Sequence, residues 1–243
     1  MNTNIEVSII VPVRNSEKYL SDCLFSALLQ DFDYPFEVIV INNGSNDHSE
    51  QIIRHFSLRH KNLRHIITKD LSVGFARKRG VEEAKGKYIC FLDSDDMYKL
   101  SFVRRMHEAI TTTNVDIVNC SYVKIMPSGR ISRNILAKKR TYDQVGGVSA
   151  LLRDFNIRGY MPMKMYRSEL IKNTHLPVSS KLIMFEDFLM NFSLYAAARK
   201  TITITDPLYF YRKTNESATS NLANNRISLH LKCFAAVRYL AEQ

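Results

Sequence analysis

Three carboxylates lie within four consecutive residues near the middle of the chain, in the cluster Asp93-Ser94-Asp95-Asp96. Carboxylates this close together repel one another unless a cation or a ring of hydrogen-bond donors compensates their charge. Hard oxygen ligands of this kind suit Mg²⁺ or Mn²⁺, and a divalent ion held there would also bind phosphate. The alternative is a solvated acidic turn that caps the next helix. The apolar run at 87–92, directly before the cluster, favours the ligand site over the turn.

A second pair of carboxylates, Glu186 and Asp187, opens an apolar helical segment. A carboxylate at the rim of a site can act as a general base toward a substrate hydroxyl. Acidic residues are also favoured in the first turn of any helix, because the helix dipole and the free backbone N–H groups attract negative charge. The residue types alone leave both interpretations open.

Two cationic segments contain groups that would suit a diphosphate. Residues 74–80 (GFARKRG) put three cations, Arg77 among them, at the start of a predicted helix, where backbone N–H groups already favour anions. Residues 209–217 (YFYRKTNES) put Arg212 and several hydroxyl groups after a predicted strand, and the alternative for this stretch is an ordinary exposed loop. Neither segment is a P-loop, and the seven histidines lack metal-ligand spacing.

Apolar, β-branched runs alternate with longer helical patterns, which is typical of an α/β domain with a largely parallel sheet. In the N-terminal half we predict strands at 6–12, 36–41, 63–68 and 87–92, and helices at 17–30, 48–60 and 73–84. Further on we predict strands at 115–125, 130–136, 201–205 and 207–213, and helices at 99–112, 143–155, from 186 onward and in the tail 221–243. The acidic cluster would follow a buried strand, and ligands of open α/β sheets bind beyond the carboxyl ends of the strands.

The composition indicates a globular protein, with 45% hydrophobic residues among 243. Its net charge of +10 would attract anions, but no RNA-binding or zinc-finger pattern accompanies the basic residues, which argues against nucleic acid as the partner. No apolar run approaches the roughly 18 to 20 residues of a membrane span, and no signal-peptide pattern is present. The four cysteines are far apart without C-x-x-C spacing, so we expect buried free thiols and a cytoplasmic location.

The order of these motifs resembles the family 2 glycosyltransferases of the GT-A fold, particularly bacterial enzymes that build capsular and other surface polysaccharides. The motifs that carry the resemblance are VSIIVPVRNSEKYLSDCLFSALLQ, EVIVINNGSNDHS, GFARKRGVEEAKGKYICFLDSDD, KMYRSEL, FEDFLMNFSLYAAA and PLYFYRKTNES, which occur in family order. The resemblance implies an α/β GT-A fold with a Rossmann-like, mostly parallel central sheet flanked by helices. We assign the GT-A domain to 1–220 and a helical C-terminal appendage to 221–243.

The resemblance also implies a role for each matched residue in a metal-dependent, inverting transfer from a nucleotide sugar, by default a UDP-sugar. The donor pocket would contain Pro12, Val13, Asn15, Glu17, Asn43, Arg77, Asp93 and Ser94. Asp95, together with Asp93, would hold Mn²⁺ or Mg²⁺ at the donor diphosphate. Asp187 would be the catalytic base with Glu186 in support, and Arg212 and Ser217 would stabilise the leaving diphosphate. The acceptor would be a hydroxyl of a glycan or a lipid-linked saccharide.

The sequence departs from the family pattern at positions that bear on the donor. Asn43 replaces a common aspartate, and Arg14 replaces a usual aromatic residue. An amide offers a base a different donor and acceptor pattern from a carboxylate, so another nucleotide remains open. The basic surface and amphipathic tail are compatible with peripheral contact at the inner face of a membrane, and packing of the tail on the protein itself is the alternative.

Two other function classes compete with the glycosyltransferase. A nucleotidyltransferase would need a glycine-rich phosphate loop near the N-terminus, and the segment VPVRNSEK has no glycine. A non-enzymatic basic module that binds nucleic acid or an anionic glycan would not depend on the acidic cluster, so Asp95→Ala separates it from an enzyme.

Overall fold

The computed structural model describes residues 4–69, 72–134, 138–153, 156–178 and 186–214, together with residues 234 and 238. Its strands are β1 (Val7–Val13), β2 (Phe36–Asn43), β3 (Leu63–Thr68), β4 (Tyr88–Phe91), β5 (Met97–Tyr98), β6 (Ile117–Ile125), β7 (Ile131–Asn134), β8 (Arg140–Asp143), β9 (Lys164–Arg167) and β10 (Lys200–Arg212). Its helices are α1 (Leu20–Leu28), α2 (Ser49–Ser57), α3 (Val73–Glu83), α4 (Phe102–Thr113), α5 (Gln144–Leu152), α6 (Ser168–Asn173) and α7 (Glu186–Ala197). No helix among these residues is long and apolar enough to cross a membrane.

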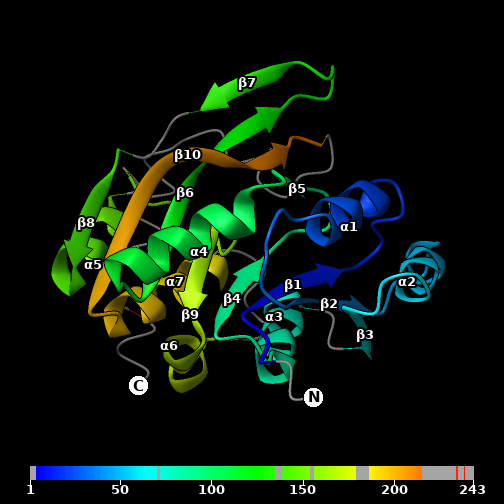
Figure 1. The fold of residues 1–243 in the computed structure, drawn as a ribbon, viewed down its shortest axis with the longest axis horizontal. Coiled ribbons are helices and arrows are strands. Elements are labelled where there is room, and N and C mark those ends of the chain that lie inside the picture. The colour runs from blue at the N-terminus through cyan, green and yellow to red at the C-terminus, as the bar shows by residue number, and fades with distance from the viewer. Residues whose placement is uncertain are drawn as a thin grey trace.

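One sheet runs through the whole domain in the order β3-β2-β1-β4-β9-β6-β10-β5, with β7 beside β6 and β8 beside β10 (Figure 1). The four strands β3, β2, β1 and β4 are all parallel, and β10 is parallel to β6. Strand β9 is antiparallel to both of its neighbours, β4 and β6, and thereby joins the two parallel parts. The prediction of an α/β fold with a mostly parallel central sheet flanked by helices is confirmed.

Helices cover both faces of the sheet, which explains why its central strands are continuous apolar runs. Along β1, Ile9 and Val11 pack into the hydrophobic cluster under α1, α2 and α4, whereas Ile10 packs into the cluster under α3, α6 and α7. Successive side chains of a strand point to opposite faces, so a strand covered on both sides is apolar except where a buried polar side chain finds a partner, as Ser8 of β1 does in Glu37 of β2. The three cysteines among the described residues, Cys23, Cys90 and Cys120, are buried free thiols as predicted.

Several predicted boundaries differ from the structure for local reasons. The two strands predicted at 201–205 and 207–213 form one strand, β10, with irregular register around Pro207, which has no N–H to donate to β6. Helix α1 begins at Leu20 rather than at 17, because the preceding residues form turns bonded to the loop after β2. The predicted tail helix at 221–243 and residue Ser217 lie outside the described residues apart from residues 234 and 238, so both stay predictions.

Helix α3 approaches β1 so closely that only glycine fits at position 80. A Cβ atom on Gly80 would lie 2.3 Å from Cγ2 of Ile10, which is fully buried. We expect Gly80→Ala to lower the free energy of unfolding by about 1–3 kcal/mol, because overpacking forces side chains and backbone out of place. Urea denaturation measures this loss. Arg79→Ala, on an exposed part of the same helix, is the control, and an equal loss in both variants would contradict the steric explanation.

Candidate functional site

The carboxyl ends of β1, β2 and β4 meet at one edge of the sheet. The register pairs Pro12 with Ile41 and Val13 with Asn42, and β4 on the other side of β1 continues into the acidic cluster. Polar side chains from all three strand ends therefore gather there, as expected for a ligand site of a parallel sheet.

The loops after β1 and β2 are joined to each other by side-chain hydrogen bonds. Asn15 has a left-handed backbone with φ of 50°, and its Oδ1 accepts the N–H of Asn46 at 2.9 Å. Glu17 accepts the backbone N–H of His48 at 2.9 Å and lies 2.6 Å from Nδ1 of the same histidine. These contacts hold Asn15 and Glu17 against the loop after β2.

Asn43 is buried at the end of β2, and both ends of its amide bond to protein. Its Nδ2 donates to the carbonyl of Ser72 at 3.0 Å, and its Oδ1 accepts the hydroxyl of Thr68 at 3.0 Å. The amide therefore ties the end of β2 to β3 and to the start of α3. A nucleobase stacked above Asn43 would face an amide whose N–H and carbonyl groups already form hydrogen bonds with the protein.

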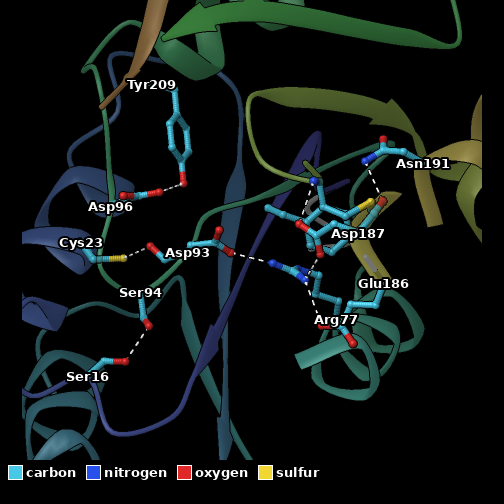
Figure 2. A network of polar contacts seen from close by, with 12 residues as sticks. Ser16, Cys23, Arg77, Asp93, Ser94, Asp96, Glu186, Asp187, Asn191 and Tyr209 are labelled. Carbon is cyan, nitrogen blue, oxygen red and sulfur yellow. Dashed lines mark hydrogen bonds and ion pairs between the residues drawn. The ribbon is translucent and has the colours of Figure 1, made fainter. Parts of the chain in front are cut away.

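The three carboxylates of the acidic cluster have different environments, and Figure 2 shows two of them, Asp93 and Asp96. Asp96 is buried and accepts the hydroxyl of Tyr209 at 2.5 Å and the backbone N–H of Arg212 at 2.7 Å, so it anchors the cluster to β10. Burial, with the nearby charge of Asp93, raises the pKa of Asp95 to about 6. A bound cation would relieve this unfavourable burial of the ionised Asp95 carboxylate.

Ser94, between these carboxylates, links the cluster to the loop after β1. Its Oγ lies 2.6 Å from Oγ of Ser16, in the same loop as Asn15 and Glu17. The strand ends of β1 and β4 are therefore joined by side chains as well as by the sheet.

Arg77 connects the acidic cluster to the two carboxylates at the start of α7 (Figure 2). Its guanidinium is almost completely buried, donates to Asp93 Oδ1 at 2.8 Å, contacts Asp187 Oδ1 directly and lies 3.9 Å from Glu186 Oε1. Burial opposes the charged form, but the carboxylates of Asp187 and Asp93 outweigh it and raise the pKa of Arg77. One cation thus balances carboxylates from two elements that are more than 90 residues apart in the sequence.

Glu186 and Asp187 lie at the inner end of α7, where each has a second partner. The Ser72 hydroxyl donates to Glu186 Oε2 at 3.2 Å, and the Met161 N–H donates to Asp187 Oδ2 at 3.2 Å. Burial raises the pKa of both carboxyls, while the charge of Arg77 opposes the rise. A raised pKa brings a carboxylate closer to the operating pH and makes it a better proton acceptor.

Arg212 lies beside the acidic cluster, in contact with Asp95 and Asp96. Its Nε donates to the carbonyl of Asp95 at 3.1 Å, its Nη2 contacts Asp22 at 3.0 Å, and the guanidinium lies over the ring of Tyr19, 4.7 Å from the centroid. The predicted diphosphate ligand Arg212 is therefore adjacent to Asp95.

Sequence reasoning missed the residues that support these groups. Tyr209, Lys164 and Asn191 lie inside quoted family motifs, which was the available signal for them, whereas Met161 lies in none. Within the described ranges no three histidine, cysteine or acidic side chains converge closely enough to hold a metal ion by themselves.

Comparison with known protein families gives a match over most of the chain. Residues 8–174 match the profile described as Glycosyl transferase family 2. The chain belongs to this family. The match spans the strand ends, Arg77 and the acidic cluster, and it ends before α7.

Curated relatives of this family 2 chain include bacterial glycosyltransferases. It is 28% identical over 220 residues to the uncharacterized glycosyltransferase EpsJ of Bacillus subtilis (strain 168), covering 88% of this chain and 62% of EpsJ. It is 28% identical over 216 residues to TarS of Staphylococcus aureus, a poly(ribitol-phosphate) beta-N-acetylglucosaminyltransferase, covering 87% of this chain and 36% of TarS.

Solved structures of TarS share the GT-A fold of this chain. The complex of TarS 1–349 with UDP-GlcNAc superposes with a TM-score of 0.75 at 25% identity, over 94% of this chain and 64% of that one. The complex with UDP gives 0.73 at 25% identity, over 86% and 61%. The chain spans less than two thirds of the length of each of these relatives.

Proposed function

We propose that this chain is the catalytic domain of an inverting glycosyltransferase that transfers a sugar from a nucleotide-sugar donor to an acceptor hydroxyl. The observation that carries the proposal is the single buried guanidinium of Arg77, which joins Asp93 of the acidic cluster to Asp187 at the start of α7. A donor bound at the acidic cluster would thereby have a buried carboxylate beside its reacting end. Membership of glycosyl transferase family 2 and the likeness to TarS, solved with UDP and with UDP-GlcNAc, support a UDP-sugar as donor.

The donor would lie along the carboxyl ends of β1, β2 and β4. The base and ribose would contact the loop of Pro12, Val13, Asn15 and Glu17, with Asn43 beneath the base and Asp93 and Ser94 beside the ribose. Arg77 and Arg212 would neutralise the diphosphate from two sides, with Ser217 as a further predicted contact. Cations at these positions act on charge that grows as the diphosphate leaves, so they lower the barrier of the transfer step.

Asp95 is the residue that would hold Mn²⁺ or Mg²⁺, with Asp93 beside it. Carboxylate oxygens are the ligands these ions prefer, and Asp95 is a partly buried carboxyl whose raised pKa a cation would reverse. When bound, the ion would supply Lewis-acid stabilisation of the leaving diphosphate. Since fewer than three protein ligands converge within the described residues, oxygens of the donor and of water would complete the coordination shell.

The proposed reaction places proton transfer on Asp187. The acceptor hydroxyl gives its proton to this carboxylate while its oxygen attacks the anomeric carbon from the side opposite the diphosphate. A new C–O bond forms, the bond from the anomeric carbon to the diphosphate breaks, and its electron pair leaves with the nucleoside diphosphate. A direct displacement of this kind inverts the anomeric configuration.

We further infer an acceptor hydroxyl on a glycan or a lipid-linked saccharide, in the synthesis of a bacterial surface polysaccharide. The curated glycosyltransferase relatives, including TarS with its poly(ribitol-phosphate) acceptor, support this inference. A cytoplasmic location and peripheral contact with the inner face of a membrane stay predictions, since the tail on which the contact depends lies outside the described residues.

Calorimetric titration with UDP, GDP, CDP and dTDP, each with and without Mn²⁺, tests the donor site. We expect one nucleotide, UDP by default, to bind in an Mn²⁺-dependent manner, and Asp95→Ala to weaken that binding at least about tenfold because a hard-oxygen ligand is lost. The matched control is Asp33→Ala, an exposed carboxylate that precedes β2 at the opposite edge of the sheet.

Failure of all four nucleotides to bind would overturn the proposed function and favour the non-enzymatic basic binding module instead. That module predicts that Asp95→Ala leaves the binding of a polyanion such as heparin unchanged or improves it, because removing a carboxylate reduces repulsion.

A further inference from the structure

A lysine that sequence analysis did not single out is fully buried next to the proposed base. Lys164, the first residue of β9, has no exposed surface, and its Nζ donates to the carbonyls of Arg158 at 2.8 Å and Tyr160 at 2.5 Å. A buried ammonium group is costly unless hydrogen bonds and opposite charge compensate it. Its retention in the core therefore calls for a physical explanation.

The two carbonyls that Lys164 binds belong to the loop that contacts Asp187. In this loop the carbonyl of Gly159 accepts Nδ2 of Asn191 at 3.1 Å, and the carbonyl of Met161 accepts the hydroxyl of Tyr166 at 3.1 Å. All four consecutive carbonyls from 158 to 161 are thus fixed by buried side chains. The loop has little freedom left, and the Met161 N–H is directed at Asp187 Oδ2.

The same side chains also fix the backbone that carries the base. Asn191 Nδ2 donates to the carbonyl of Asp187 at 3.1 Å (Figure 2), and its Oδ1 accepts the Tyr166 hydroxyl at 2.8 Å. Tyr166 lies two residues after Lys164 in β9, so both side chains point to the same face of the sheet. Strand β9 and helix α7 together clamp the 158–161 loop against the carboxyl.

Charge is the second property that Lys164 brings to the carboxyl of Asp187. The titratable and charged side chains that act on this carboxyl are Arg77, Asp93, Lys164, Tyr166 and Glu186. Burial and Asp93 raise its pKa, whereas Arg77 and Lys164 lower it. Arg77 also donates to Asp93, whereas Nζ of Lys164 donates to two carbonyls of the loop beside Asp187.

We propose that Lys164 is a positioning residue for the base: it fixes the 158–161 loop so that the Met161 N–H orients the Asp187 carboxyl, and it brings a buried positive charge to the same loop. The proposal rests on the proposed function, in which Asp187 accepts the proton of the acceptor hydroxyl. It predicts both a local change in the loop and a change in the pH dependence of turnover when Lys164 is replaced.

Hydrogen exchange at the Met161 amide tests the positioning without any assay of transfer. In Lys164→Met, which is similar in length and lacks both the donors and the charge, we expect this amide to exchange at least about tenfold faster, because its loop loses two charge-assisted hydrogen bonds. The control is Lys172→Met, since Nζ of this exposed lysine also donates to a carbonyl, that of Ala84 at 2.6 Å, away from Asp187. Unchanged exchange in a folded Lys164→Met protein would overturn the proposal.

The pH profile of donor hydrolysis, measured as release of nucleoside diphosphate, tests the role of the charge. We expect the acidic limb of the pH–rate profile to move to higher pH in Lys164→Met, because the base loses a nearby positive charge. The same shift is expected in Lys164→Gln, which restores hydrogen-bond donors but no charge. In Lys172→Met the limb should stay in place. A purely structural lysine would lower the rate without moving the limb, and that result would overturn the electrostatic part of the proposal.

If wild-type protein binds no nucleotide, the proposed function fails, and hydrogen exchange alone then decides whether Lys164 fixes the loop. If Lys164→Met does not fold, Lys164→Leu, which also lacks donors and charge, replaces it in hydrogen exchange, and Lys164→Gln alone serves for the pH profile.

Discussion

We expect Asp187→Asn to lower the rate of sugar transfer by orders of magnitude while nucleotide binding is retained. General-base catalysis contributes about 10² to 10⁴ to a rate, so we expect a loss of that size or more when the proton acceptor becomes an amide. Asparagine has the shape of aspartate and can still accept the Met161 N–H through Oδ1, so the loop at 158–161 should stay in place. Release of nucleoside diphosphate measures turnover, and calorimetric titration with the same nucleotide measures binding.

Glu186→Gln is the matched control for this prediction. Glu186 precedes the proposed base, shares Arg77 with it and contacts the Ser72 hydroxyl, but we assign it support rather than proton transfer. We therefore expect a smaller loss of turnover than in Asp187→Asn. A larger loss of turnover in Glu186→Gln than in Asp187→Asn would indicate that Glu186 is the base. Near wild-type turnover in both variants would indicate that the base does not lie in α7.

Arg77→Met should produce the largest loss of stability of any single substitution in the site. Arg77 is almost fully buried against the carboxylates of Asp93, Glu186 and Asp187, and its removal leaves them without their cation. Breaking a buried ion pair from one side typically costs about 3–5 kcal/mol, and we expect a loss of that order at pH 8. Urea denaturation of wild type and variant measures it.

The pH dependence of this loss identifies its cause. Burial already raises the pKa of Glu186 and Asp187 in the folded protein against the opposing charge of Arg77, so removal of the guanidinium should raise both pKa values further above their unfolded values. A group with a raised folded pKa contributes stability below its unfolded pKa and loses it as the pH rises through the folded pKa. The difference between wild type and Arg77→Met should therefore narrow as the pH falls from 8 toward the ordinary carboxylate range.

Arg79→Met provides the comparison on the same helix. Arg79 is half-exposed and pairs with Glu83 within α3, so its replacement should cost no more than about 1 kcal/mol at any pH. An Arg77→Met loss that does not change with pH would indicate lost packing of the side chain rather than lost charge compensation.

The sequence by itself determined the parallel half of the sheet and the position of the acidic cluster. A strand covered on both faces is mostly apolar, and this pattern appears in the run of β1 from Val7 to Val13, in which Ser8 is the one polar residue, and again in β4 before Asp93. Alternating strands and helices then limit the topology to a few arrangements, which all bring the carboxyl ends of these strands to one edge. The roles expected for Asp187 and Arg212 came from the resemblance to the family motifs.

Tertiary structure decided what each of these polar groups does. The residue types alone could not show that Asp96 is an anchor rather than a ligand, because this difference arises from Tyr209 and Arg212 in β10, more than 110 residues away. The sequence also did not predict that β9 lies antiparallel between β4 and β6, because β9 is a strand of only four residues. Secondary structure follows from neighbouring residues, whereas ion pairs and desolvation depend on which distant segments the fold brings together. For this reason the contact of Arg77 with Asp187 and the burial of Lys164 became visible only in the folded chain.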